Sequence, residues 1–273
     1  MNHALLSDLV LGLAACSYIA ATFSFTLHLA RKGGWQNATR VARWLMALGV
    51  LLHAGYLGYV SIAQHVCPMK TIHFGVSTGG LAAAFAYLVA RRYLKIYGLG
   101  VFVAPISLVF LLAGRFVAVH QLSPQLRSSL LPLHVTANVL GDAFFIIASG
   151  AAAMYLFQER RLKAKRGSSV FGRLPPIDAL DRTAHIFLVA GFLFATIGAA
   201  TGTIWVAKLQ VGTTAEFLRV LFGYATWAIF SAVLLLRATL GWRGRRAAYG
   251  TLIGFVFAMI VVLLYLLGSG GSS

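Results

Sequence analysis

Three polar residues in one apolar stretch carry the most evident chemistry of this chain. The stretch LPLHVTANVLGDAF covers residues 131–144 and places His134, Asn138 and Asp142 four residues apart. On an α-helix this spacing brings the three side chains onto one gently drifting face. A neutral imidazole binds transition metals and haem iron, so His134 is the candidate metal ligand. Asn138 and Asp142 are the candidate polar groups of the same pocket.

The composition indicates that lipid surrounds most of the chain. Hydrophobic residues make up 59% of the 273 residues, charged residues only 11%, and the mean hydropathy is +0.82. A helix that spans the hydrocarbon layer needs ~20 apolar residues, and the runs here lack the alternation of a membrane barrel. They predict eight transmembrane helices near residues 4–30, 39–63, 71–92, 96–118, 131–157, 183–207, 217–236 and 247–267. We therefore expect an all-α fold, one polytopic bundle over residues 1–267 with a disordered tail over 268–273.

The distribution of charge predicts the orientation of this bundle. A net charge of +17 arises from 23 Lys and Arg against 6 Asp and Glu, and most of the basic residues fall in the first, third, fifth and seventh loops. By the positive-inside rule these loops are cytoplasmic and both termini lie outside. The loops are short and lack interleaved aromatic residues, which argues against nucleic acid as a partner. Anionic membrane lipids are their expected contact. No basic segment precedes the first apolar run, so we expect that helix to be retained.

The predicted orientation gives each polar side chain a depth. His134 comes out near the outer face, and Asp142 lies roughly 16 Å deeper than the start of its helix, at a rise of about 1.5 Å per residue. An intramembrane carboxylate also leaves open a small transporter or proton path through Asp142. On the next helix, Thr196 and Thr201 are candidate cofactor contacts, although such hydroxyls usually bond neighbouring helices. Trp205, at the outer boundary where an amphipathic ring is favoured, is a further candidate cofactor contact.

The longest connection, residues 158–182, is the candidate partner surface. Its first part, ERRLKAKR, is expected to extend the fifth helix beyond the bilayer, and Asp178 or Asp181 to cap the sixth. A short interfacial helix is expected over residues 119–130. A basic surface of this kind could meet an acidic partner protein. The candidate partner-binding residues are Arg160, Arg161, Lys163, Lys165, Arg166, Arg243, Arg245 and Arg246.

Three segments resemble a known family in their order and spacing. They are LHVTANVLGDAFFIIASGAAAMYLFQERRLK, LDRTAHIFLVAGFLFATIGAATGTIW and LLLRATLGWRGRRAAYGTLIGFVF, within residues 131–260. They resemble the CcsA/HemX-type cytochrome c assembly family of integral membrane proteins. The resemblance implies a multi-pass protein of the bacterial cytoplasmic membrane that handles haem, expected to be of b type. It places His134 on the first external haem-ligating histidine of the family. Its implied partners are cytochrome c assembly components or a haem-biosynthetic enzyme.

The chain departs from the full family pattern at three points. No Trp-Gly-x-x-Trp-x-Trp-Asp segment follows Trp205, and Leu235 stands where the family has a membrane histidine. The second external histidine of the family would follow the eighth helix, where this chain has only GSGGSS after residue 267. The resemblance is therefore nearest to the short HemX or YpjD subgroup. It implies a non-enzymatic protein that assists cytochrome c biogenesis by binding haem, rather than a haem ligase. A HemX-like regulator of a haem-biosynthetic enzyme and the path through Asp142 remain the alternatives.

Overall fold

The protein is a bundle of membrane-length helices in the computed structural model, which describes residues 3–30, 37–63, 72–116, 130–164, 174–208 and 214–268. The helices are α1 (His3–Ala30), α2 (Ala38–Ala63), α3 (Ile72–Ala90), α4 (Gly100–Phe116), α5 (Leu131–Lys163), α6 (Ile177–Lys208), α7 (Thr214–Thr239) and α8 (Arg245–Gly268), with a short 3-10 helix η2 (Tyr97–Leu99) before α4. No strand occurs in these ranges. The predicted all-α fold with eight helices is confirmed.

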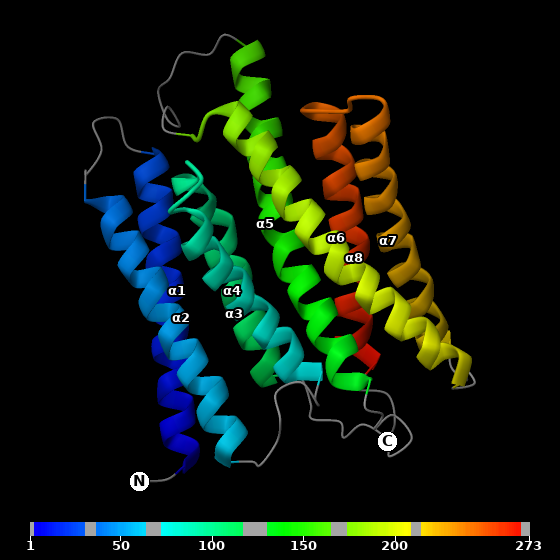
Figure 1. Ribbon diagram of the computed structural model, residues 1–273. Helices are drawn as coiled ribbons and strands as arrows, with labels where there is room; N and C mark the ends of the chain where they lie inside the picture. Colours follow the sequence, from blue (N-terminus) through cyan, green and yellow to red (C-terminus); the bar gives the residue numbers. More distant parts are fainter. Residues whose placement is uncertain are drawn as a thin grey trace.

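Seven of these helices are long and apolar enough to cross a membrane, and α3 contributes a shorter apolar helix over Phe74–Ala90. The chain is thus a multi-pass membrane protein. Figure 1 shows the start of α1 and the end of α8 at one end of the bundle. We call the other end, where α5 ends at Lys163 and α8 begins at Arg245, the basic end. It carries the loops predicted to be cytoplasmic.

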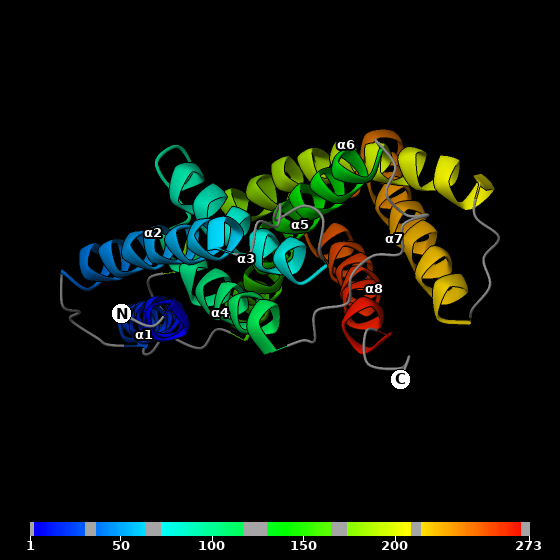
Figure 2. The ribbon, with the colours of Figure 1, turned by 90° about the horizontal axis from the view of Figure 1, so that it is seen from below.

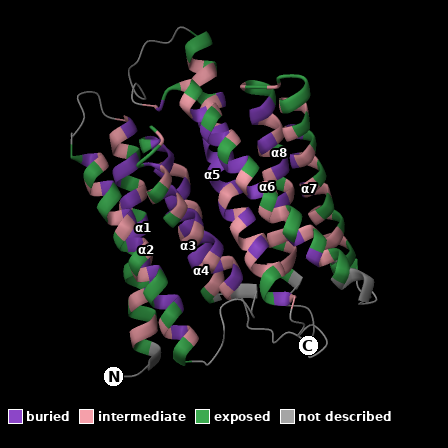
Figure 3. Ribbon diagram, viewed as in Figure 1, coloured by how far each residue is buried: buried purple, intermediate pink, exposed green. Residues whose placement is uncertain are grey.

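Helix α5 is the central element of the bundle. It contacts α3, α4, α6 and α8, and seen along the bundle it lies between the group of α1 to α4 and the group of α6 to α8 (Figure 2). Its buried positions concentrate from Ala143 to Leu156 and include many Ala, Gly and Ser residues (Figure 3). Small side chains allow close helix approach in lipid, where packing rather than hydrophobic burial drives association. This packing brings α5 close to its neighbouring helices, most extensively to α6.

A buried polar cluster joins the first three helices. The His53 ring lies 3.3 Å through Nδ1 from the Tyr18 hydroxyl and 2.9 Å through Nε2 from the Ser77 hydroxyl. All three side chains are buried. Buried polar groups require hydrogen-bond partners, and here each partner comes from a different helix. The cluster therefore fixes how α1, α2 and α3 pack together.

Two helices start four or more residues away from the predicted positions. Helix α6 begins at Ile177, six residues earlier than expected, so Asp178 lies in its first turn and Asp181 lies inside it. The expected cap role is therefore wrong for both residues, although an acidic first turn still favours the helix dipole. Helix α4 begins at Gly100, after η2, rather than near residue 96. The expected extension of α5 is confirmed as far as Lys163, while the helix expected over 119–130 and the tail expected over 268–273 lie outside the described residues, apart from Gly268 at the end of α8.

Candidate functional site

The imidazole of His134 is held by α6. Its Nδ1 lies 3.0 Å from the Gly198 carbonyl oxygen and 3.1 Å from the Thr201 hydroxyl. The Thr201 hydroxyl itself lies 2.8 Å from the Ile197 carbonyl oxygen, to which it donates. A carbonyl oxygen only accepts hydrogen bonds, so Nδ1 of His134 carries the ring proton. The lone pair of the ring is then on Nε2, the atom available to a metal.

Asn138 covers that lone pair. Its side-chain Nδ2 lies 3.2 Å from Nε2 of His134 and 2.8 Å from the His134 carbonyl oxygen one turn earlier. The amide therefore donates hydrogen to both acceptors, and an incoming metal would replace only its bond to Nε2. The side chains of His134 and Asn138 are both half-buried. The predicted pairing of these two residues on one face is confirmed.

Two glycines of α6 make room for this arrangement. A Cβ atom on Gly198 would overlap the side-chain amide of Asn138, and one on Gly202 would lie 3.1 Å from Cε1 of His134. One turn deeper, Gly141 of α5 lies against the Gly191 carbonyl in the same helix pair. The small residues of the TIGAATG segment therefore have a positional role, since they let an imidazole and an amide fit between two packed helices.

Asp142 does not join the network of His134 and Asn138. Its side chain is half-buried, and in the described part of the chain its carboxylate has no hydrogen bond or ion pair. The drift of the helical face explains the separation, because successive i+4 positions rotate by about 40° around the axis. The structure thus brings together His134, Asn138 and Thr201, and leaves Asp142 as a separate intramembrane carboxyl group.

The other two predicted pocket residues of α6 have different surroundings. The Thr196 hydroxyl donates to the Phe192 carbonyl oxygen at 2.7 Å and accepts from Nε1 of Trp227 at 3.0 Å. It therefore links α6 to α7 and makes no contact with the His134 group. The side chain of Trp205 lies outside the described residues. A hydroxyl pair between Thr203 and Tyr224, 2.6 Å apart, provides a second α6–α7 link.

Sequence reasoning missed a charged cluster at the basic end. The Arg237 guanidinium donates to both carboxylate oxygens of Asp181, with distances of 3.1 Å from Nη1 to Oδ1 and 2.6 Å from Nη2 to Oδ2. The backbone N–H of Gly244 donates to Oδ1 of Asp181 at 2.9 Å. The three groups come from α6, α7 and the turn before α8, so sequence spacing could not reveal the cluster. A hint lay in the quoted segments, which contain LDR, LLLR and GWRG.

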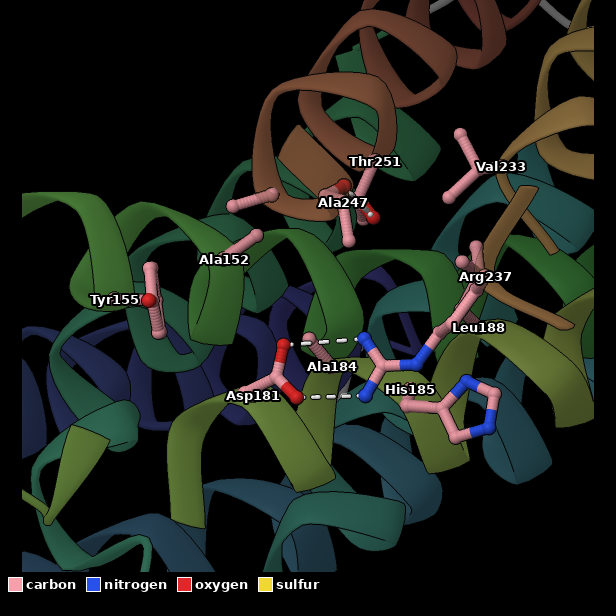
Figure 4. A pocket seen from close by; sticks show the side chains of 11 residues that line it. Ala152, Tyr155, Asp181, Ala184, His185, Leu188, Val233, Arg237, Ala247 and Thr251 are labelled. Carbon is pink, nitrogen blue, oxygen red and sulfur yellow. Dashed lines mark hydrogen bonds and ion pairs between the residues drawn. The ribbon is translucent and has the colours of Figure 1, made fainter. Parts of the chain in front are cut away.

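This charged cluster forms part of the wall of a small cavity, shown in Figure 4. Its volume of about 10 Å³ is of the size that holds a single water molecule. His185, one turn along α6 from Asp181, also lines it, and its Nδ1 is buried without a hydrogen-bond partner among the described residues. The cavity is too small for a porphyrin. The cluster joins α6, α7 and the turn before α8 at the basic end.

The predicted partner residues gather at the same end of the bundle. Arg160 donates to the Tyr249 hydroxyl at 3.1 Å, and the Arg245 guanidinium lies over the same ring at 5.5 Å from its centre. The end of α5 and the start of α8 thus form one basic surface. Arg161 lies over Phe157, Lys163 pairs with Glu159, Arg246 lies over Trp242, and Arg243 is exposed. Lys165 and Arg166 lie outside the described residues.

The site offers one possible metal-binding atom, Nε2 of His134, which suits the axial position of a haem iron better than a centre that needs several protein ligands. Within the ranges that the structure describes, no group of three His, Cys, Asp or Glu side chains could hold a metal ion. Haem iron is held by four porphyrin nitrogens, so one protein imidazole with a fixed tautomer is sufficient to anchor it. His134 meets this requirement, because the Gly198 carbonyl fixes its Nδ1–H.

Comparison with known proteins extends the resemblance over most of the chain. The model of the family described as "Cytochrome C assembly protein" matches residues 45–270, well beyond the 131–260 segment identified from motifs. The "Cytochrome c biogenesis protein CcsA" of Guillardia theta is 28% identical over 216 residues, which cover 71% of this chain and 71% of the relative. The protein of the same name from Prochlorococcus marinus (strain MIT 9515) is 28% identical over 248 residues, covering 82% of this chain and 74% of the relative. This membrane bundle, with its half-buried histidine held between two packed helices, therefore belongs to the cytochrome c assembly protein family.

Proposed function

We propose that this protein assists cytochrome c assembly by binding haem through Nε2 of His134. The observation that carries the proposal is the bond from Nδ1 of His134 to the Gly198 carbonyl oxygen, which leaves the Nε2 lone pair for iron. The curated relatives named for cytochrome c biogenesis support the same process. Haem would supply the iron-porphyrin group that a cytochrome c requires, and b-type binding means that the histidine is its only protein attachment.

Each neighbouring residue has a defined task in this proposal. The Gly198 carbonyl and the Thr201 hydroxyl hold the imidazole plane and its tautomer. A hydrogen-bonded Nδ1–H raises the basicity of Nε2 and so strengthens its bond to a metal. Asn138 keeps Nε2 solvated by an amide hydrogen while no metal is bound, then retains its bond to the His134 carbonyl. Asp142 would contribute polarity deeper in the same region.

A haem titration with matched variants tests the proposal. We expect purified protein in detergent to shift the Soret band of added haem, and His134→Ala to weaken binding at least tenfold. Added imidazole should restore the shift in His134→Ala, because it replaces the missing ligand, which a merely structural role would not allow. Asn138→Ala should keep the shift, since it removes only the amide that covers Nε2. His185→Ala, in the distant cavity wall, is the control. Identical spectra for wild type and His134→Ala would contradict the proposal.

We assign the protein within the family to the short HemX-like subgroup, as an assisting rather than a ligating member. Two features support this assignment. The sequence VAKLQVGTTAEFLRVLFGYATW after Trp205 contains no Trp-rich segment, and Leu235 occupies the position of the family's membrane histidine. In the structure the Leu235 side chain is largely exposed on α7. A haem-binding protein without those groups would store, pass on or sense haem rather than attach it.

A further inference from the structure

A second ligand site is indicated by Arg91, directly after α3 at the basic end. Its side chain is only 8% exposed, although arginine is rarely buried without a partner. The guanidinium lies 6.0 Å from the centre of the Tyr87 ring and 5.5 Å from that of Tyr97. Its Nη1 is buried and has no hydrogen-bond partner within the described ranges. The two rings hold the guanidinium without satisfying its N–H groups.

Among the described residues, no ion pair joins Arg91 to a carboxylate. No Asp or Glu occurs between Asp8 and Asp142. Asp8 lies at the opposite end of the bundle, where its carboxylate pairs with Arg115 at 3.2 Å. Instead, burial lowers the pKa of Arg91, and the nearby positive charge of Arg43 lowers it as well. A buried cation without an anion is costly, so these residues leave an unmet requirement for negative charge.

The surroundings of Arg91 place it where several helices meet at the membrane boundary. Gly98, in the η2 turn that follows Arg91, lies against Leu29 at the end of α1, Met154 of α5 and Pro175 before α6. Figure 1 shows the connection from α3 to α4 at the end of the bundle where α1 ends and α2 begins. This is the basic end, which faces the cytoplasm by the positive-inside prediction. Basic pockets between transmembrane helices on that side of a membrane bind anionic lipid headgroups.

We propose that Arg91, framed by Tyr87 and Tyr97, binds a phosphate group at the basic end of the bundle. The planar guanidinium fork matches two oxygens of a phosphate, and the unpartnered Nη1 supplies a donor for one of them. The phosphate comes from an anionic phospholipid headgroup or from free phosphate in the cytoplasm, which present the same chemistry. A bound phosphate would fix the α3–α4 connection against α1 and α5. This site is independent of the haem proposal.

Thermal unfolding in lipid nanodiscs tests this site. Three conditions are compared, namely phosphatidylcholine alone, phosphatidylcholine with phosphatidylglycerol, and phosphatidylcholine with inorganic phosphate in the buffer. We expect phosphatidylglycerol to raise the Tm of the wild type by several degrees and Arg91→Gln to lose at least half of that gain. Arg92→Gln removes the same charge from an exposed neighbour and should keep the gain. In phosphatidylcholine alone, Arg91→Gln should be no less stable than the wild type, because it removes an unpaired buried charge.

The three conditions distinguish a lipid headgroup from free phosphate as the source of the bound phosphate, and they also show which results contradict the proposal. An Arg91-dependent gain with inorganic phosphate identifies free phosphate as the ligand, and one with phosphatidylglycerol alone identifies the lipid. Equal gains in wild type and Arg91→Gln, or equal destabilisation of Arg91→Gln in all discs, would overturn the proposal in favour of a structural role. If Arg91→Gln yields no folded protein, native mass spectrometry compares the wild type with Arg91→Lys. The wild type should retain bound phosphatidylglycerol or phosphate that the lysine variant loses, and equal retention overturns the proposal.

Discussion

A histidine inside a membrane helix has two ring nitrogens to satisfy, and the partner of one decides what the other can bind. In His134 the Gly198 carbonyl takes the Nδ1 proton, so ligand chemistry falls to Nε2. His53 is the contrast within the same chain, because its two nitrogens lie against the Tyr18 and Ser77 hydroxyls and the whole residue is buried in the core. The two histidines have the same side chain but different surroundings, since His53 is fully buried, whereas His134 is half-buried with a side-chain amide on its Nε2.

We predict that Gly198, which lies against Asn138, is as important for haem binding as the proposed ligand His134. In Gly198→Ala, the new Cβ atom would overlap the Asn138 amide and push it and His134 off α6. Overpacking of this kind typically costs about 1–3 kcal/mol. We expect a lower Tm together with weaker haem binding, measured by thermal unfolding and by the Soret titration. Gly223→Ala is the control, since its Cβ atom would meet open space. Wild-type binding by Gly198→Ala would show that α6 does not position the imidazole.

At the scale of elements, the charged cluster at the basic end links α6, α7 and the turn before α8. Asp181 of α6 receives two bonds from Arg237 of α7 and one from the backbone of Gly244 before α8. Gly244 has a φ of +64°, in the left-handed region that favours glycine, and this conformation accompanies its N–H bond to the carboxylate. One carboxylate therefore connects three elements at this end.

Loss of that carboxylate is expected to destabilise the protein. Asp181→Asn keeps the shape but removes the charge from a largely buried ion pair, whose side chains are 12% and 20% exposed. We expect a loss of roughly 2 kcal/mol in unfolding free energy, as for other hydrogen bonds to charged groups. Lys163→Met, which breaks the more exposed Lys163–Glu159 pair, should change stability by only a few tenths of a kcal/mol. Thermal unfolding in detergent measures both. Equal effects of the two substitutions would contradict the assigned role.

At the scale of the whole molecule, the even number of helices places the start of α1 and the end of α8 at one end, opposite the basic surface. His134 lies near the end where α1 begins and α8 ends, and Arg91 lies at the basic end. The haem site and the phosphate site would thus face opposite sides of the membrane. An inward phosphate site suits a basic surface against anionic lipid.

Labelling of single cysteines tests this orientation. In a variant without Cys16 and Cys67, cysteine is introduced at the exposed positions Thr214 or Arg243. The Thr214→Cys variant should react with a membrane-impermeant maleimide in intact cells, because the start of α7 is predicted to lie outside. The Arg243→Cys variant should react only after permeabilisation. The reverse pattern would invert the topology and place His134 on the cytoplasmic side.

Hydrophobic run length and helical period by themselves determined the eight helices, the extension of α5 to Lys163 and the common face of His134 and Asn138, since these depend on local geometry. The tertiary structure decided which atom meets which. The packing of α5 against α6, about 60 residues apart in the chain, decides three features. These are the fit of Gly198 and Gly202 against Asn138 and His134, the proton on Nδ1 of His134, and the separation of Asp142 from both. The partners of Asp181 and the unbalanced charge of Arg91 were also beyond sequence reasoning. Contacts between distant segments depend on how whole helices pack, which no local pattern encodes.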